Sequence, residues 1–282
     1  MKAMVQSIRD IIRSRLTTVP EPPTAPEPRF EQSPHRQIST PAVSLCAITE
    51  VGQFRTHNED AYALSNDGLL WALADGMGGH TLGEMASTLA VSAIMEVLQP
   101  ARREIPVRDR LTLAFAKAQS AVAIHSLERA GWRGMGSTAV AGVVEGDIVH
   151  ICHVGDSRAY HWSGGRLRRL TNDHSWAGEL IAAGLLTPEQ ARSHPLRGSL
   201  TRAIGAKDCA VPEFTSVKVK DGDRVLLCSD GLWEALGDGE LRAELGSRGS
   251  MRQVATALVD RANSASGRDN ITAILYRHSG NH

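Results

Sequence analysis

Apolar residues in this chain gather in short runs separated by glycine, aspartate and asparagine. Several runs have the length and β-branched content of strands, at residues 44–51, 69–75, 137–146, 147–156, 224–231 and 270–277. Longer stretches have helical spacing, at residues 83–98, 107–130, 176–184 and 251–262. The Glu-Gly-Asp sequence at 145–147 predicts a hairpin. Because strands follow one another without an intervening helix, the pattern favours antiparallel sheets with helices packed outside them.

The first 40 residues differ in pattern from the rest of the chain. Residues 1–19 carry apolar residues at helical spacing with arginines between them, which predicts a short amphipathic helix. Such a helix would dock on a partner or an anionic membrane surface, the alternative being a leader without function. Seven of the twelve prolines lie between positions 20 and 41, so residues 20–40 are predicted to be a flexible linker. Residues 41–282 are predicted to form one domain.

Composition excludes several classes of protein. The 282 residues include 31 Lys+Arg and 31 Asp+Glu, and a net charge of zero argues against a general nucleic-acid binder. The longest apolar run, residues 69–74, is far shorter than the roughly 20 residues of a membrane span. The four cysteines have no CxxC spacing, which indicates neither a disulfide framework nor a zinc knuckle. We therefore expect a protein of the reducing cytoplasm.

Aspartates stand at the ends of the predicted strands. Three of them close an apolar run and one directly precedes a strand: Asp75, Asp156, Asp230 and Asp269. Acids that lose water close to one another are costly unless a cation compensates them. Mg²⁺ and Mn²⁺ prefer such oxygen ligands. The alternative for each Asp-Gly pair is an ordinary turn.

Two further features favour an ion site and a phosphate site over plain turns. Gly76, Gly78 and Gly79 exceed what a two-residue turn needs and would let backbone carbonyls approach an ion. Upstream, Arg55 lies close to the acidic pair at residues 59–60, and an arginine fork suits a phosphate dianion. A surface run of ion pairs is the alternative for this second cluster.

Eight motifs in the chain occur in the order known from one family. They lie at residues 52–62, 72–80, 134–140, 153–160, 170–175, 194–205, 226–236 and 267–275. With them the sequence resembles the metal-dependent (type 2C) serine/threonine protein phosphatases in their bacterial form. The resemblance implies an α+β fold, in which two antiparallel β-sheets pack as a sandwich flanked by helices on both sides (a four-layer α-β-β-α arrangement). It also implies a mobile flap at about residues 171–200.

The resemblance implies roles for individual residues around two Mn²⁺ or Mg²⁺ ions and a third, weaker ion. Asp75 would bridge the two ions, and Arg55 would grip the substrate phosphate. The remaining metal positions are Asp230 and Asp269 for the first ion, the Gly76 carbonyl for the second, Glu59 and Asp60 near the second through water, and Asp156 for the third. Met77 stands where animal relatives have a histidine, so His80 is the candidate general acid. The alternative for His80 is a structural helix cap.

The expected reaction is hydrolysis of phosphoserine and phosphothreonine by direct attack of a metal-bridging hydroxide, without a phosphoenzyme. The resemblance implies phosphorylated protein substrates, among them a serine/threonine kinase and its targets. We expect a monomer.

Other chemistries fit the sequence less well. Cys152 and Arg158 match the C-x5-R spacing of cysteine-dependent phosphatases, but Cys152 lies in an apolar run typical of an inert thiol. His150 and His153 are three residues apart on a predicted strand, so they would point to opposite faces and not share a zinc ion. A non-enzymatic pseudophosphatase scaffold would require a broken metal set, and the aspartates are all present.

Overall fold

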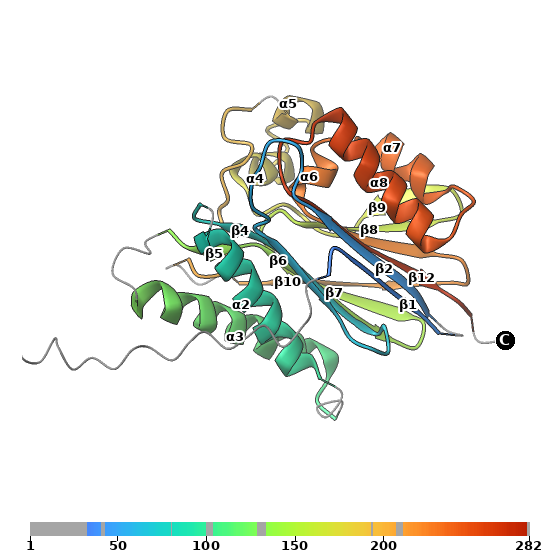
Figure 1. Cartoon of the computed structure of the whole chain (residues 1–282), viewed down its shortest axis with the longest axis horizontal. Coiled ribbons are helices and arrows are strands. Elements are labelled where there is room, and N and C mark those ends of the chain that lie inside the picture. Colours follow the sequence, from blue (N-terminus) through green and yellow to red (C-terminus); the bar gives the residue numbers. More distant parts are fainter. Residues whose placement is uncertain are drawn as a thin grey trace, which may run out of the picture.

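Two antiparallel sheets pack face to face in the computed structural model, with helices covering both outer surfaces (Figure 1). The structure describes residues 33–40, 43–79, 81–99, 104–128, 134–192, 194–206 and 211–280. The first sheet has the strand order β1 (His35–Ser39), β2 (Val43–Glu50), β12 (Ile271–His278), β11 (Arg224–Cys228), β8 (Arg158–Ser163) and β9 (Arg166–Arg169). The second has the order β10 (Glu213–Lys218), β7 (Ile148–Val154), β6 (Ala139–Glu145), β4 (Leu70–Met77) and β3 (Asp60–Leu64), with β5 (Gly136–Ser137) paired to the end of β4.

Helices form the two outer layers of the molecule. On the second sheet lie α2 (Thr81–Leu98) and α3 (Val107–Glu128), and on the first lie α6 (Asp230–Trp233), α7 (Asp238–Leu245) and α8 (Met251–Ala265). Two further helices, α4 (Trp176–Ala182) and α5 (Pro188–Arg192), stand beside α6 at one end of the sandwich (Figure 1). The predicted four-layer α-β-β-α fold is therefore confirmed.

Strand β4 shows why the sequence folds this way. Its alternate residues face different layers: Trp71 and Leu73 lie in the core between the sheets, while Ala72 and Ala74 face α2. Both faces are buried, so the strand reads as a continuous apolar run rather than an alternating one. The small alanines let the helix approach closely, and the large Trp71 fills the space between the sheets, where its ring stacks on Tyr276 at 5.3 Å.

The predicted elements and the structure differ mainly at short, polar segments. The hairpin is confirmed, since Glu145 pairs with Ile148 across a two-residue turn. The four predicted helices are α2, α3, α4 and α8. Strands β1, β3 and β8 to β10 and helices α5 to α7 were not predicted, because each is short or exposes polar residues on one side.

Strand β1 corrects the predicted linker at residues 20–40. Residues 35–39 pair with β2 in an antiparallel ladder, in which Ile38 packs against the core between the sheets. Arg36 Nη1 also donates to the Leu64 carbonyl at 2.9 Å. Alternating exposure at the edge of a sheet allows a polar, proline-flanked segment to form this strand. Residues 1–19 and the linker up to residue 32 lie outside the described residues.

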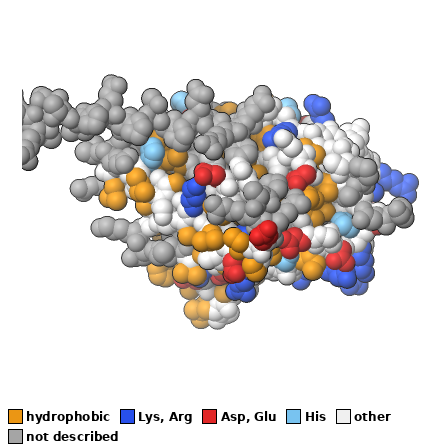
Figure 2. All heavy atoms as spheres, turned by 90° about the horizontal axis from the view of Figure 1, so that it is seen from below, with side chains coloured by type: hydrophobic (Ala, Val, Ile, Leu, Met, Phe, Trp, Pro, Cys, Tyr) orange, Lys and Arg blue, Asp and Glu red, His pale blue; other side chains and the backbone are white. Residues whose placement is uncertain are grey.

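Helix α2 is the one helix among the described residues that is long and apolar enough to cross a membrane. More than half of it is buried against α3 and the second sheet, as expected of a core helix. The described part of the surface is mixed in character: hydrophobic, basic and acidic side chains are interspersed on the face seen from below (Figure 2). No single sign of charge dominates that face, which accords with the neutral net charge.

Candidate active site

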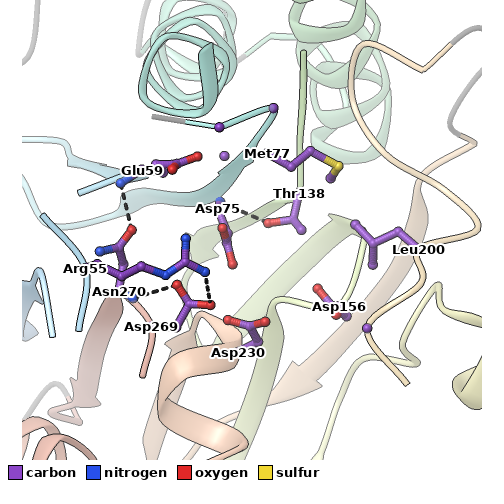
Figure 3. A pocket seen from close by; sticks show the side chains of 14 residues that line it. Arg55, Glu59, Asp75, Met77, Thr138, Asp156, Leu200, Asp230, Asp269 and Asn270 are labelled. Atoms are coloured by element: carbon purple, nitrogen blue, oxygen red, sulfur yellow. Dashed lines mark hydrogen bonds and ion pairs between the residues drawn. The ribbon is translucent and has the colours of Figure 1, made fainter. Parts of the chain in front are cut away.

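An acidic pocket opens at the end of the sandwich where β4, β7 and β11 end and β12 begins. Its volume is about 410 Å³. The carboxylates of Asp75, Asp156, Asp230 and Asp269 point into this space, with Arg55 beside Asp269 (Figure 3). Glu59, Gly76, Thr138 and Asn270 also line it. The structure thus brings together, from distant parts of the chain, residues that the sequence analysis named as candidates.

Hydrogen bonds to its backbone groups hold Asp75 at the centre of the pocket. Its N–H donates to Thr138 Oγ1 at 3.0 Å, and its carbonyl accepts from the Thr138 N–H and the Ser137 hydroxyl, both at 2.8 Å. The side chain is therefore free to project from the end of β4. Burial raises the pKa of Asp75 well above its usual range, and the carboxylates of Asp60 and Asp230 raise it further.

Asp230 and Asp269 reach the pocket from the first sheet. Asp230 begins α6 after Ser229, the residue that follows β11, and Asp269 directly precedes Asn270 and β12. Burial raises the pKa of Asp230 well above its usual range, and the neighbouring Asp156 and Asp269 carboxylates raise it further. Asp269 Oδ2 accepts from Arg55 Nη2 at 2.8 Å. The strand ends thus fix a second pair of acids opposite Asp75.

Asp156 stands on a tight turn after β7. Gly155 has a φ of 100°, and a Cβ there would lie 2.6 Å from the Thr138 side chain, so only glycine fits this approach. Burial raises the pKa of Asp156 to about 7, with a further contribution from Asp173. The Asp156 carbonyl accepts from Trp233 Nε1 at 3.0 Å, which ties this turn to α6.

The acidic pair at residues 59–60 lies against the inner wall of the pocket. Asp60 pairs with Asp75 across β3 and β4, and its Oδ2 accepts from the hydroxyls of Ser229 and Thr272 at 2.8 and 2.6 Å. Burial raises the pKa of Asp60 to about 6. Glu59 is buried beside Gly83, where a Cβ would lie 1.8 Å from Glu59 Oε2. Glycine at position 83 therefore makes room for the carboxylate under the start of α2.

Sequence reasoning missed two residues that shape the pocket. Asn270 donates from Nδ2 to the carbonyls of Val51 and His57 at 2.8 and 2.9 Å, and its Oδ1 accepts from the Glu59 N–H at 2.8 Å. It thereby fixes the loop that carries Arg55. Thr138 holds the backbone of Asp75. Asn270 and Thr138 lie within the motifs at 267–275 and 134–140, and this position is the sequence feature that could have identified them.

The donor set of the acidic pocket fits divalent cations. Among the described residues, Asp60 Oδ1 and Asp230 Oδ1 are buried carboxylate oxygens without a hydrogen-bond partner. Buried, unpartnered and mutually repelling carboxylates are costly, and a hard cation with oxygen ligands removes that cost. The residues that would hold cations here are Asp75, Asp230, Asp269 and Asp156, with Glu59, Asp60 and the Gly76 carbonyl close by.

A family model described as Protein phosphatase 2C matches residues 53–276. The chain belongs to this family. Protein phosphatase PhpP of Streptococcus pneumoniae is 36% identical over 238 residues, which make up 83% of this chain and 96% of PhpP. The crystal structure of the Mycobacterium tuberculosis serine/threonine phosphatase PstP/Ppp matches with a TM-score of 0.77 and 32% identity, covering 84% of this chain and 99% of that one. A structure of the PstP catalytic domain in complex with two manganese ions matches with a TM-score of 0.76, 30% identity and coverage of 84% and 99%.

Within this protein phosphatase 2C domain, the position of Cys152 argues against its use as a nucleophile. The thiol is fully buried in β7, and burial raises its pKa. Arg158, the other end of the C-x5-R spacing, is bound to Asp173 through two hydrogen bonds of 2.9 and 2.6 Å. A buried thiol with a raised pKa is a poor nucleophile, and Cys152 does not line the acidic pocket. His80, the predicted general acid, lies outside the described residues.

A second cluster of potential ligand atoms lies at the base of the flap. Ligand atoms of His153, His174 and Glu213 lie within 4.8 Å of one another, whereas His150 faces Glu145 instead. Arg202 Nη1 lies 3.2 Å from His174 Nε2 and 3.1 Å from Glu213 Oε1, so a guanidinium already occupies this position. His174 Nδ1 accepts from the Gly155 N–H at 3.2 Å. We therefore interpret the cluster as a hydrogen-bonded anchor for the flap and assign no metal to it.

Proposed function

We propose that this protein phosphatase 2C family member is a metal-dependent protein serine/threonine phosphatase that hydrolyses phosphoserine and phosphothreonine. The observation that carries the proposal is the convergence of four aspartates and Arg55 in one pocket. When bound there, a pair of Mn²⁺ or Mg²⁺ ions supplies a water of lowered pKa and neutralises charge on the transferring phosphoryl group. The PstP structure with two manganese ions supports this choice of cofactor.

Residues of the chain bind and orient the substrate. Arg55 now pairs with Asp269, and its side chain is 44% exposed toward the pocket mouth. When Asp269 holds a cation, the guanidinium fork is available to grip two phosphate oxygens. The loop that carries Arg55 is fixed by Asn270, so the fork is positioned before the substrate arrives.

We infer direct attack by water rather than by a protein nucleophile. The hydroxyl that lines the pocket, Thr138 Oγ1, is engaged with the Asp75 N–H and the Ser157 hydroxyl. The leaving alkoxide needs a proton, and we propose His80 as its source because it follows the glycine-rich turn after Asp75. A weak third ion at Asp156 belongs to the same proposal.

Removal of the central carboxylates tests the function. We expect Asp75→Asn and Asp230→Asn to reduce Mn²⁺-dependent hydrolysis of p-nitrophenyl phosphate at least a thousandfold, because each removes a charge that holds the cations. The matched control is Asp221→Asn, which changes an aspartate in an exposed turn and leaves turnover intact. Calorimetric titration with Mn²⁺ completes the test: wild-type protein that binds no Mn²⁺ would instead be a pseudophosphatase.

We further propose that the substrates are phosphorylated proteins, including a serine/threonine kinase and its targets, and that the enzyme acts as a cytoplasmic monomer. Relatives named as serine/threonine phosphatases, among them stp of Listeria monocytogenes, support the substrate class. Light scattering during gel filtration measures the oligomeric state. Phosphoproteomics of a strain that lacks the protein, compared with one that carries Asp75→Asn, identifies the substrates.

A further inference from the structure

A second cavity adjoins the acidic pocket and is not needed to hold cations. Its volume is about 830 Å³, and it shares Arg55, Asp230 and Asp269 with the acidic pocket. Helices α4 and α5 form one wall, and α6 with the segment before β12 forms the other. We name this space the flap groove. Because the two spaces share lining residues, a chain bound by its phosphate in the pocket can continue into the groove.

Most charged side chains that line the flap groove are paired with one another; of the others in the lining, Asp230 belongs to the acidic pocket, and Arg268 and Asp238 are of opposite sign. Arg158 and Arg169 both contact Asp173, at 2.6 and 3.3 Å. Arg197 lies 3.7 Å from Glu234. Arg55 is paired with Asp269 unless that carboxylate holds a cation. An acidic side chain entering the groove would compete with these carboxylates for the same arginines, so charge does not favour it.

The walls of the flap groove also offer apolar surface to an occupant. Aliphatic side chains from the flap line one side, namely the buried Ala177 and Ala191 and the more accessible Ile181 and Pro188. Trp233 lines the other side, and it is held rigidly: its Nε1 donates to the Asp156 carbonyl, and the Arg158 guanidinium lies 3.4 Å from its ring centroid. A rigid indole opposite an aliphatic wall is typical of a site for an apolar side chain.

We infer that the flap groove binds the substrate segment next to the phosphorylated residue and selects an apolar side chain there. The inference rests on the proposed phosphatase function, since that function places the phosphate beside Arg55. Ile181 is the residue we expect to contact the apolar side chain directly. It is half-buried in the groove wall, whereas Leu185, one turn further along the chain, is 70% exposed and does not line the groove.

Kinetics with phosphopeptides test the inference. The substrates are phosphoserine peptides in an alanine background, with leucine or aspartate placed in turn at each position beside the phosphoserine. At the preferred position we expect the wild type to favour leucine over aspartate by about tenfold in kcat/KM, mainly through KM. Ile181→Asp removes this preference, and Ile181→Ala reduces it. The matched control, Leu185→Asp, places the same charge in the same flap and keeps the wild-type ratio.

The outcomes separate the inference from the function on which it rests. Hydrolysis of p-nitrophenyl phosphate by the wild type reports the acidic pocket alone. If that activity is present and the wild type treats leucine and aspartate peptides alike, or Ile181→Asp keeps the ratio, the groove inference is wrong and the phosphatase function stands. If Mn²⁺ supports no hydrolysis of any of these substrates, the proposed function fails and the inference fails with it.

Discussion

Asn270 shows how one side chain can prepare a catalytic loop without touching the substrate. Its three hydrogen bonds all reach backbone groups of the loop between Val51 and Glu59. Asn270 is 4% exposed and its bond to the Glu59 N–H is buried, so water cannot readily replace that bond if the amide is removed. The position of Arg55 therefore depends on a residue more than two hundred positions away in the chain.

We predict that Asn270→Ala lowers the free energy of unfolding by about 2–4 kcal/mol, because it removes three hydrogen bonds to backbone groups, of which the one to the Glu59 N–H is buried and the other two are partly buried. It should also raise KM for p-nitrophenyl phosphate, since the loop that carries Arg55 loses its anchor. Urea unfolding and steady-state kinetics measure the two effects. The control Asn66→Ala removes an exposed amide that contacts Arg36, and we expect less than about 0.5 kcal/mol there. Equal losses in the two variants would contradict this role.

The sequence predicted the acids of the site but not the groups that hold them. Asp75 and Asp230 could be found because an acid at the end of an apolar strand is conspicuous and each lies in a recognisable motif. Thr138 and Asn270 escaped notice because their partners are backbone atoms of distant segments, and no local pattern reports such contacts. The roles of the individual metal positions stay predictions, as does that of His80.

At the scale of elements, the flap is attached to both sheets through neighbouring residues at its base. Asp173 binds Arg158 of β8 in the first sheet, and His174 contacts Gly155 at the end of β7 in the second. The bridge between Ser175 and Leu200 then closes the segment that carries α4 and α5. The sequence predicted α4 from its periodicity, but it gave no sign of α5, which is only one turn long.

The ion pair between Asp173 and Arg158 should contribute strongly to stability because both side chains are buried. Their side chains are 7% and 14% exposed. We predict that Asp173→Asn costs about 3–5 kcal/mol, because it leaves the Arg158 guanidinium buried without its counter-charge. Trypsin should then cleave faster after Arg197, which is exposed within the flap.

The matched control for this prediction is a surface ion pair. Asp147→Asn breaks a contact of 2.9 Å between Asp147, whose side chain is 50% exposed, and Lys218, whose side chain is 75% exposed, so we expect a far smaller loss of stability than in Asp173→Asn. Urea unfolding and the rate of tryptic cleavage measure both variants. A flap that resists trypsin equally in the wild type and Asp173→Asn would mean that this ion pair does not hold it.

At the scale of the whole molecule, the acidic pocket lowers the stability of the folded, metal-free protein at the pH at which the enzyme is expected to work. The fold brings together carboxyls that burial and mutual repulsion make hard to ionise, including Asp60 with a pKa raised to about 6 and Asp156 with a pKa raised to about 7. Two sheets joined through a large apolar core supply the stability that tolerates this cost. The sequence resemblance predicted this sandwich, whereas composition and periodicity alone reached only antiparallel sheets with outer helices.

The raised pKa values of these buried carboxyls predict how pH and metal ions affect the stability of the protein. A carboxyl with a raised pKa in the folded protein binds protons more readily there than in the unfolded chain, so metal-free protein should lose stability as pH rises from about 4 to 7. Mn²⁺ binds the ionised form, so it should stabilise the protein by about 3 kcal/mol at pH 8 when its concentration is a hundred times its Kd at that pH, and by less at pH 5.5. The double variant Asp75→Asn/Asp230→Asn should be more stable than metal-free wild type at pH 8, because the repulsion is gone, and should no longer respond to Mn²⁺. Calorimetric melting at the two pH values, with Mn²⁺ or EDTA, measures each effect. A wild-type protein that gains the same stability from Mn²⁺ at both pH values would show that protons and cations do not compete for these carboxylates.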